Sequence, residues 1–85
     1  MKLYKVELCL RLVLPRLRNY KLHEYNYENP IVFVQGSDPD DACSRAFNNL
    51  IGIILKQDMS PNTISLIKEI SNDIRIIKVS IPDDK

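Results

Sequence analysis

The stretch IVFVQGSDPDDACSRA, residues 31–46, decides the fold of this chain. Its first four residues are apolar and favour a β-strand, and Gly36 ends that strand. A helix start signal follows directly, with Asp38 as the expected N-cap and Pro39 as the first helical residue. The two aspartates after Pro39 complement the positive end of the helix dipole. The stretch therefore predicts a strand, a tight turn and a helix, with Gly36 allowing the helix to pack close to the strand.

The sequence before this unit predicts two strands. Alternate apolar residues over 3–14 define one buried strand face, formed by Tyr4, Val6, Leu8, Leu10, Leu12 and Leu14. Pro15 ends this first strand, because proline cannot donate to the ladder. A second strand is expected from about Tyr20 to Gln35, with an interruption at Pro30. In its second half, Val32 and Val34 share one face.

The sequence after residue 38 predicts two helices and a last strand. The long helix is expected from Pro39 to about Gln57, with an apolar seam of Ala42, Ala46, Leu50, Ile53 and Ile54 that is widened by Cys43, Phe47, Ile51 and Leu55. Ser60 is expected to cap a short helix that starts at Pro61 and turns Ile64, Ile67 and Ile70 inward. Residues 74–81 predict the last strand, with Ile77, Val79 and Ile81 on the core face. A bulge is expected in it, because Ile74 and Ile76 do not fit that alternation.

These elements define a single small α+β domain over residues 1–85. We expect a two-layer domain with a three-stranded antiparallel sheet and the element order β-β-α-α-β. One long and one short helix are expected on one face of the sheet. The first strand is expected at the centre, where its apolar face is best covered.

Composition supports a globular, intracellular chain. The sequence has 85 residues, of which 45% are hydrophobic and 27% charged, as in ordinary folded domains. No apolar run is long enough to cross a bilayer, so no membrane association is expected. Glu7 and Arg11 interrupt the apolar pattern of the first residues, which is unlike a signal peptide. Two cysteines without a secretion signal favour a reduced, cytoplasmic protein.

The chemistry-bearing residues do not assemble into a predicted active site. His23 is the only histidine, and Cys9 and Cys43 form no CxxC motif, so neither a metal site nor a redox pair is expected. The aspartates at the start of the long helix would repel a phosphate group. We therefore expect no cofactor, no metal, no small-molecule substrate and no enzymatic activity.

The richest surface pattern lies in residues 16–27, which we call the ribbon. The net charge of the whole chain is +1, but residues 1–36 carry +3 and residues 37–85 carry −2. Cations and tyrosines alternate in and near the ribbon, and these residues are the predicted partner-binding residues: Arg11, Arg16, Arg18, Tyr20, Lys21, Tyr25 and Tyr27. Three interpretations stay open, namely a solvated hairpin, a protein interface rich in Tyr and Arg, and a surface for single-stranded nucleic acid.

The function expected from these features is that of a small non-catalytic protein-binding module. It would dock on a larger protein or associate with itself, and the alternative is RNA or single-stranded DNA binding through the ribbon. The turn that starts at Val34 resembles the turns of many small phage and ribosome-associated proteins, and the resemblance carries over no functional residue. Small size and high Ile and Asn usage are compatible with a virus-encoded accessory or inhibitor protein.

Overall fold

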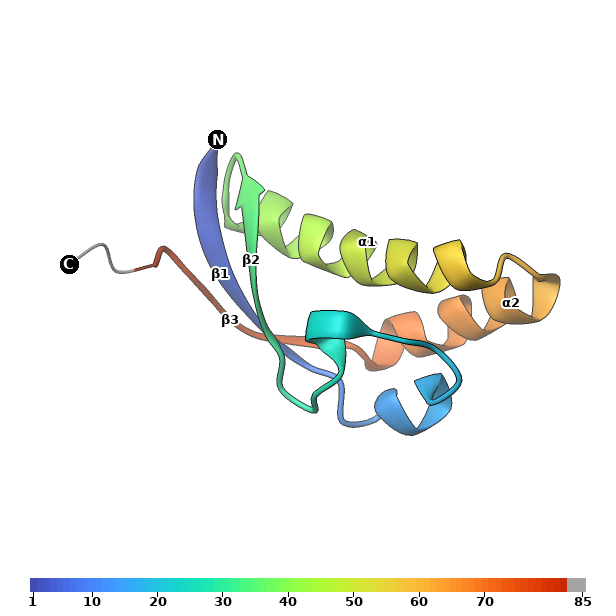
Figure 1. Ribbon diagram of the computed structural model, residues 1–85. Helices are drawn as coiled ribbons and strands as arrows, with labels where there is room; N and C mark the ends of the chain where they lie inside the picture. Colours follow the sequence, from blue (N-terminus) through green and yellow to red (C-terminus); the bar gives the residue numbers. More distant parts are fainter. Residues whose placement is uncertain (83–85) are drawn as a thin grey trace.

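The computed structural model describes residues 1–82, and these contain three strands and two α-helices (Figure 1). The strands are β1 (Lys2–Cys9), β2 (Ile31–Gly36) and β3 (Arg75–Ser80), and the helices are α1 (Pro39–Gln57) and α2 (Pro61–Ile70). Three short 3-10 turns lie in the connections: η1 (Leu14–Leu17), η2 (His23–Tyr25) and η3 (Ser71–Asp73). The strands and helices follow one another as predicted, β-β-α-α-β.

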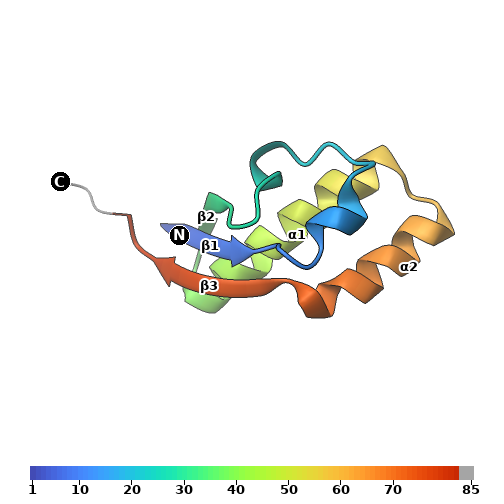
Figure 2. The ribbon, with the colours of Figure 1, turned by 90° about the horizontal axis from the view of Figure 1, so that it is seen from below.

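The sheet is antiparallel with the strand order β2-β1-β3, so β1 is central, as predicted. Val6 pairs with Val32 on one side and with Val79 on the other. Because side chains alternate along each strand, these three valines face the same side of the sheet. Figures 1 and 2 show α1 on that side, with α2 running back beside α1 and past the end of the sheet.

β3 contains the predicted bulge. Glu7 faces Lys78, whereas the next residue of β1, Leu8, faces Ile76, so Ile77 is an extra residue in the ladder. Such an insertion bends the strand and increases its local twist.

The core face predicted for the last strand is wrong for two of its three residues. Val79 is half-buried, but Ile77 and Ile81 are exposed. The reason is that Ile77 is the bulged residue and Ile81 lies beyond the end of β3 at Ser80.

β1 is shorter than predicted and ends at Cys9 rather than near Leu14. The N–H groups of Val13 and Leu14 both donate to the carbonyl of Leu10, at 3.0 and 2.9 Å. This turn buries Val13 and leaves Leu12 56% exposed, so the alternation seen in the sequence does not continue as a strand face.

The predicted strand from Tyr20 to Gln35 is wrong over its first half, and only Ile31–Gly36 is extended as β2. Leu22 and Tyr25 are both buried, and their spacing of one 3-10 turn places them on the same side of η2. The ribbon therefore does not form a β-hairpin but a folded loop. The loop rejoins the sheet where the Leu8 N–H donates to the Pro30 carbonyl at 3.0 Å.

α1 has the predicted bounds and the predicted cap. The Asp38 side chain accepts from the Asp41 N–H at 2.8 Å, which satisfies one of the free donors of the first turn. The Asp41 carboxylate accepts from the Ser37 N–H and from Arg45, and these hydrogen bonds lower the pKa of Asp41. Four of the five residues of the predicted seam are buried, namely Ala42, Ala46, Leu50 and Ile54, and the fifth, Ile53, is half-buried.

α2 begins at Pro61 after the Ser60 cap, as predicted, but its inner face differs from the prediction. Ile70 is buried and Ile67 half-buried, whereas Ile64 is 41% exposed and Thr63 is buried in its place. The Thr63 hydroxyl is tolerated there because it is hydrogen-bonded.

Candidate functional site

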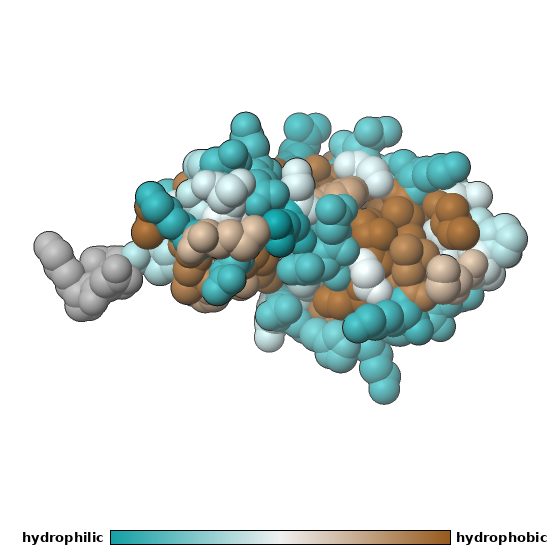
Figure 3. All heavy atoms as spheres, turned by 90° about the horizontal axis from the view of Figure 1, so that it is seen from above, coloured by the Kyte–Doolittle hydropathy of each residue, from teal (hydrophilic) through white to brown (hydrophobic). Residues whose placement is uncertain are grey.

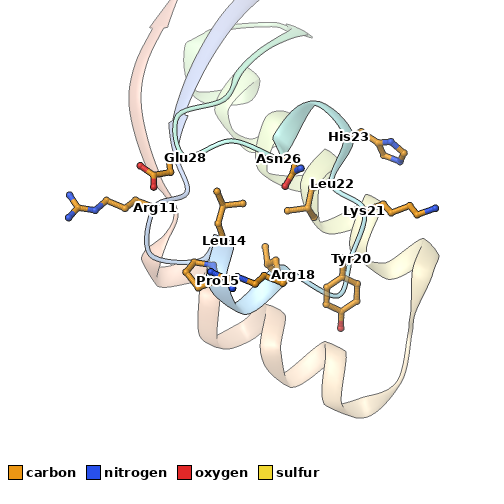
Figure 4. A pocket seen from close by; sticks show the side chains of 11 residues that line it. Arg11, Leu14, Pro15, Arg18, Tyr20, Lys21, Leu22, His23, Asn26 and Glu28 are labelled. Atoms are coloured by element: carbon orange, nitrogen blue, oxygen red, sulfur yellow. The ribbon is translucent and has the colours of Figure 1, made fainter.

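A cavity lies in the folded connection between β1 and β2, and we call it the loop pocket (Figure 4). Its volume is about 590 Å³. Its lining combines apolar side chains with cations: Leu14, Pro15, Leu17 and Leu22 belong to the first group, and Arg11, Arg18 and Lys21 to the second. Tyr20, His23, Asn26 and Glu28 complete it.

The loop pocket has an apolar floor and a basic rim. Figure 4 shows Leu14 and Leu22 facing one another across it, while Arg11 and Lys21 extend from opposite sides. Leu22 is 2% exposed and fixed, whereas the side chains of the rim are exposed. Glu28 is the only acid of the lining. Among residues 1–82, none of the pocket's Arg and Lys side chains forms an ion pair, so the rim carries uncompensated positive charge.

Hydrogen bonds to α1 fix the loop on one side of the pocket. The Lys21 N–H donates to the Gln57 side-chain oxygen at 2.8 Å, and the Gln57 amide nitrogen donates to the Lys21 carbonyl at 2.7 Å. This reciprocal pair holds the backbone of Lys21 at the last residue of α1, while the Lys21 ammonium stays in solvent.

A hydroxyl network fixes the loop to the connection between α1 and α2. The Thr63 hydroxyl donates to Asp58 at 2.7 Å, and the Tyr20 hydroxyl lies 2.7 Å from the same Thr63 oxygen. Since Thr63 has a single hydroxyl proton, Tyr20 is the donor to Thr63. Hydrogen bonds from Thr63, and then from Ser60, lower the pKa of Asp58 below its usual value.

Tyr25 anchors the loop from the core. Its side chain is 1% exposed and its hydroxyl donates to the Ala46 carbonyl at 2.9 Å. Burial, followed by the nearby Glu24 carboxylate, raises the pKa of Tyr25 to about 12. Tyr25 therefore supports the surface from below and offers no ring to a partner.

The structure brings four of the seven predicted partner-binding residues together in the loop pocket: Arg11, Arg18, Tyr20 and Lys21. Arg16 lies outside it and forms an ion pair with Glu69 of α2. Tyr27 is also outside the lining and is 66% exposed.

Sequence analysis did not identify Leu14, Leu22, Asn26 or Glu28 as site residues. Leu14 was assigned to a strand face, and the other three gave no signal, because only the 3-10 turns bring them together.

His23 carries the one positive φ angle among the non-glycine residues that the structure describes, at 53°. Left-handed backbone is unfavourable for a side chain with a Cβ, although His tolerates it better than most residues. This strained residue lies on the wall of the loop pocket. Local backbone strain of this kind clusters at functional sites.

A second, apolar groove lies between α1 and the start of β3. It has a volume of about 310 Å³ and is lined by Cys43, Phe47, Ile74 and Ile76, with Ser44 and Asn48. Figure 3 shows further hydrophobic side chains gathered over the helical half of the molecule. Burial, with a smaller effect of Asp40, raises the pKa of the Cys43 thiol, so this cysteine is not activated as a nucleophile.

Within residues 1–82, no three His, Cys, Asp or Glu side chains gather where they could hold a metal ion. None of the helices in the same range is long and apolar enough to cross a membrane. Comparisons with protein-family models, curated proteins and solved structures found no match.

Proposed function

We propose that this chain is a non-catalytic binding module that holds a short acidic segment of a partner protein in the loop pocket. The observation that carries the proposal is the apolar floor between Leu14 and Leu22, bounded by three cations and a single acid, Glu28. Among residues 1–82, none of the three cations forms an ion pair. The segment would place one apolar side chain on the floor and carboxylates beside Arg18 and Lys21. Such a module suits an accessory or inhibitor protein that acts by docking.

The loop is built to present this surface in one conformation. Tyr20, Lys21 and Tyr25 are each hydrogen-bonded to a helix or to the residues between helices. A pre-ordered loop loses less conformational entropy on binding than a free one, which favours recognition.

The lining supports binding more than catalysis. Among the described residues that line the loop pocket there is no Ser, Thr, Cys or Asp side chain, and the Tyr20 hydroxyl is engaged by Thr63. A catalytic site needs an acid–base or nucleophilic pair, and Figure 4 shows His23 and Glu28, the residues of the lining most suited to acid–base chemistry, at opposite sides of the pocket.

The expected affinity for an isolated peptide is modest. Burying one Leu-sized side chain contributes about 1.5–3 kcal/mol, and each exposed ion pair contributes about 0–1 kcal/mol. After the cost of ordering the peptide, a dissociation constant on the order of 1 mM or weaker is expected. The partner's whole surface would add to this.

The nucleic-acid alternative through the ribbon receives less support. The ribbon is a folded loop, Tyr25 is buried, and the Tyr20 hydroxyl is bound to Thr63. Tyr27 is left as the one freely exposed ring of the three, and it lies outside the lining that gathers Arg11, Arg18 and Lys21.

The test is a titration of the ¹⁵N-labelled protein followed by NMR. Three peptides separate the contributions: a Leu flanked by Glu residues, the same Leu flanked by Lys residues, and a Gly flanked by Glu residues. We expect only the first to shift the amides of residues 11–28 in a saturable way. Equal binding of the Lys-flanked peptide would refute the charge argument, and absence of any saturable shift would refute the proposal.

A pair of charge reversals provides the control. Arg18→Glu is expected to weaken binding about three- to tenfold, because one exposed ion pair becomes a repulsion. Lys68→Glu makes the same change of charge on α2, outside the lining, and is expected to leave the affinity unchanged.

A further inference from the structure

No helix within residues 1–82 covers the second face of the sheet. α1 packs on one side, and Figure 1 shows both helices on that side. On the other side, Lys5 pairs with Phe33 of β2 and Glu7 pairs with Lys78 of β3. We call this the open face.

The open face carries net positive charge. Lys5, Arg75 and Lys78 lie on it, because Arg75 pairs with Cys9, which alternates with Glu7 on the same side of β1. Among the described residues of the three strands, Glu7 is the only acid. The charge of this surface is therefore complementary to that of an anionic ligand.

The open face also presents an aromatic ring. Phe33 is 57% exposed although it lies within a strand, and Lys5 is its direct cross-strand neighbour. A cavity of about 280 Å³ beside Phe33 is lined by Val34 and Gln35 of β2 and by Arg45 and Asn49 of α1, so it lies at the β2 edge next to α1. On the open face itself, Gln35 lies two residues along β2 from Phe33. An exposed ring beside a cation and an amide side chain is suited to stack a base and to hydrogen-bond its edge.

The dimensions of the sheet argue against a second copy of this chain as the occupant. Three strands about 4.8 Å apart, each about six residues long at about 3.4 Å per residue, cover roughly 300 Å². Even twice that area, to allow for the relief of the side chains, is below the roughly 800 Å² that each partner of a stable complex buries. A few stacked nucleotides need no more than a surface of this size, since on the order of two or three bases occupy a comparable sheet.

We propose that the open face binds single-stranded nucleic acid, with a base stacked on Phe33 and the phosphates beside Lys5, Arg75 and Lys78. This site is independent of the loop pocket, so each proposal stands or fails separately. A chain with both sites would connect a protein partner to a nucleic acid strand.

Fluorescence anisotropy tests the proposal with labelled oligouridine and oligothymidine of about ten nucleotides, a length within the range that single binding folds cover. Binding of either single strand at low salt, in preference to a duplex of the same length, is the expected result. With three phosphates neutralised, the logarithm of the association constant should fall with the logarithm of salt concentration with a slope of about −2. Absence of binding at low salt, or equal binding of the duplex, would overturn the proposal.

Two substitutions separate stacking from burial of apolar surface. Phe33→Leu keeps an apolar side chain at an exposed position but removes the ring, and is expected to weaken binding about tenfold. Phe33→Tyr keeps the ring and is expected to bind like the parent chain. Unchanged affinity in Phe33→Leu would exclude stacking on this ring.

Two further variants test location and the competing occupant. Lys5→Glu is expected to abolish binding, whereas Lys68→Glu on α2, outside the sheet and the loop pocket, is expected to leave it intact, and the reverse pattern would overturn the assignment. Sedimentation of the parent chain and of Phe33→Leu completes the test. Self-association that disappears in the variant would show that a second copy, and not nucleic acid, occupies this face.

Discussion

Gly36 lies so close to the first turn of α1 that a Cβ at this position would stand 2.9 Å from the backbone nitrogen of Ala42. The neighbour is backbone inside a helix, which cannot turn away as a flexible side chain would. The strand and the helix that the sequence places three residues apart are therefore packed at a distance that only glycine permits.

Replacing Gly36 by alanine is expected to lower the free energy of unfolding by about 1–3 kcal/mol, the usual cost of overpacking. Gly52 provides the matched control, because a Cβ there meets nothing within 4 Å. Gly52→Ala is expected to raise the free energy of unfolding by about 1 kcal/mol through helix propensity. Equilibrium urea denaturation measures both, and a stabilising Gly36→Ala would contradict the close packing.

The left-handed backbone of His23 predicts an unusual gain from glycine. His23→Gly is expected to raise the free energy of unfolding by up to about 1 kcal/mol, because glycine adopts this conformation without a Cβ penalty. His23→Ala removes the same imidazole and keeps the Cβ, so no gain is expected. Thermal unfolding followed by circular dichroism distinguishes them, and an equal gain in the alanine variant would locate the effect in the ring.

Tyr25 predicts a loss of stability in alkali. Its pKa is raised to about 12 in the folded protein, from 10.0, by burial and by Glu24. The unfolded chain therefore loses this proton first, and the contribution of Tyr25 is complete below about pH 10 and lost as the pH rises through about 12. Urea denaturation measured from below pH 10.0 up to about pH 12 should show a smaller decline in the free energy of unfolding for Tyr25→Phe than for the parent chain. Parallel declines would indicate that Tyr25 ionises as a solvated side chain.

Thr63 connects Tyr20 to Asp58, and its hydroxyl is expected to matter more than its methyl group. Thr63→Val should lower the free energy of unfolding by about 1–3 kcal/mol, because the partners of a buried hydroxyl lose their hydrogen bonds. It should also raise the pKa of Asp58 toward its usual value. In the parent chain, the stabilising effect of the Asp58 carboxylate is lost as the pH falls through its lowered pKa, and in the variant it should be lost at a higher pH. Thr63→Ser keeps the hydroxyl and should behave like the parent chain. Urea denaturation measures the free energy of unfolding, and a carboxyl titration by NMR measures the pKa of Asp58. An unchanged pKa of Asp58 in Thr63→Val would show that Ser60 alone stabilises the charge.

The sequence predicted best what local interactions determine. The bounds of α1 follow from Asp38 and Pro39, whose capping role needs no information about the rest of the chain. The central position of β1 followed from one strand having the longest apolar face. A bulge in the last strand followed from Ile74 and Ile76 not fitting its alternation, but its position at Ile77 did not, because Ile77 was expected on the core face.

The sequence could not predict the loop pocket, because its shape depends on contacts between distant segments. Apolar alternation continues through Leu12 and Leu14, yet the turn at Leu10 ends the strand. The aromatic residues suggested a hairpin, whereas Tyr25 reaches Ala46 of α1 and Tyr20 reaches Thr63 of α2. The spacing of Leu22 and Tyr25 was the one available signal for a 3-10 turn, and it was too short to outweigh β-propensity.

The bulge in β3 has a consequence for the behaviour of the chain in concentrated solution. β3 is an edge strand with Ile76 and Ile77 exposed, and a regular apolar edge is a template on which other chains add strands and aggregate. The extra residue at Ile77 breaks the even spacing of backbone donors and acceptors, and Lys78 places a charge beside it. A strand from a second molecule therefore finds no continuous register to pair with, and the sheet stops growing at its own third strand.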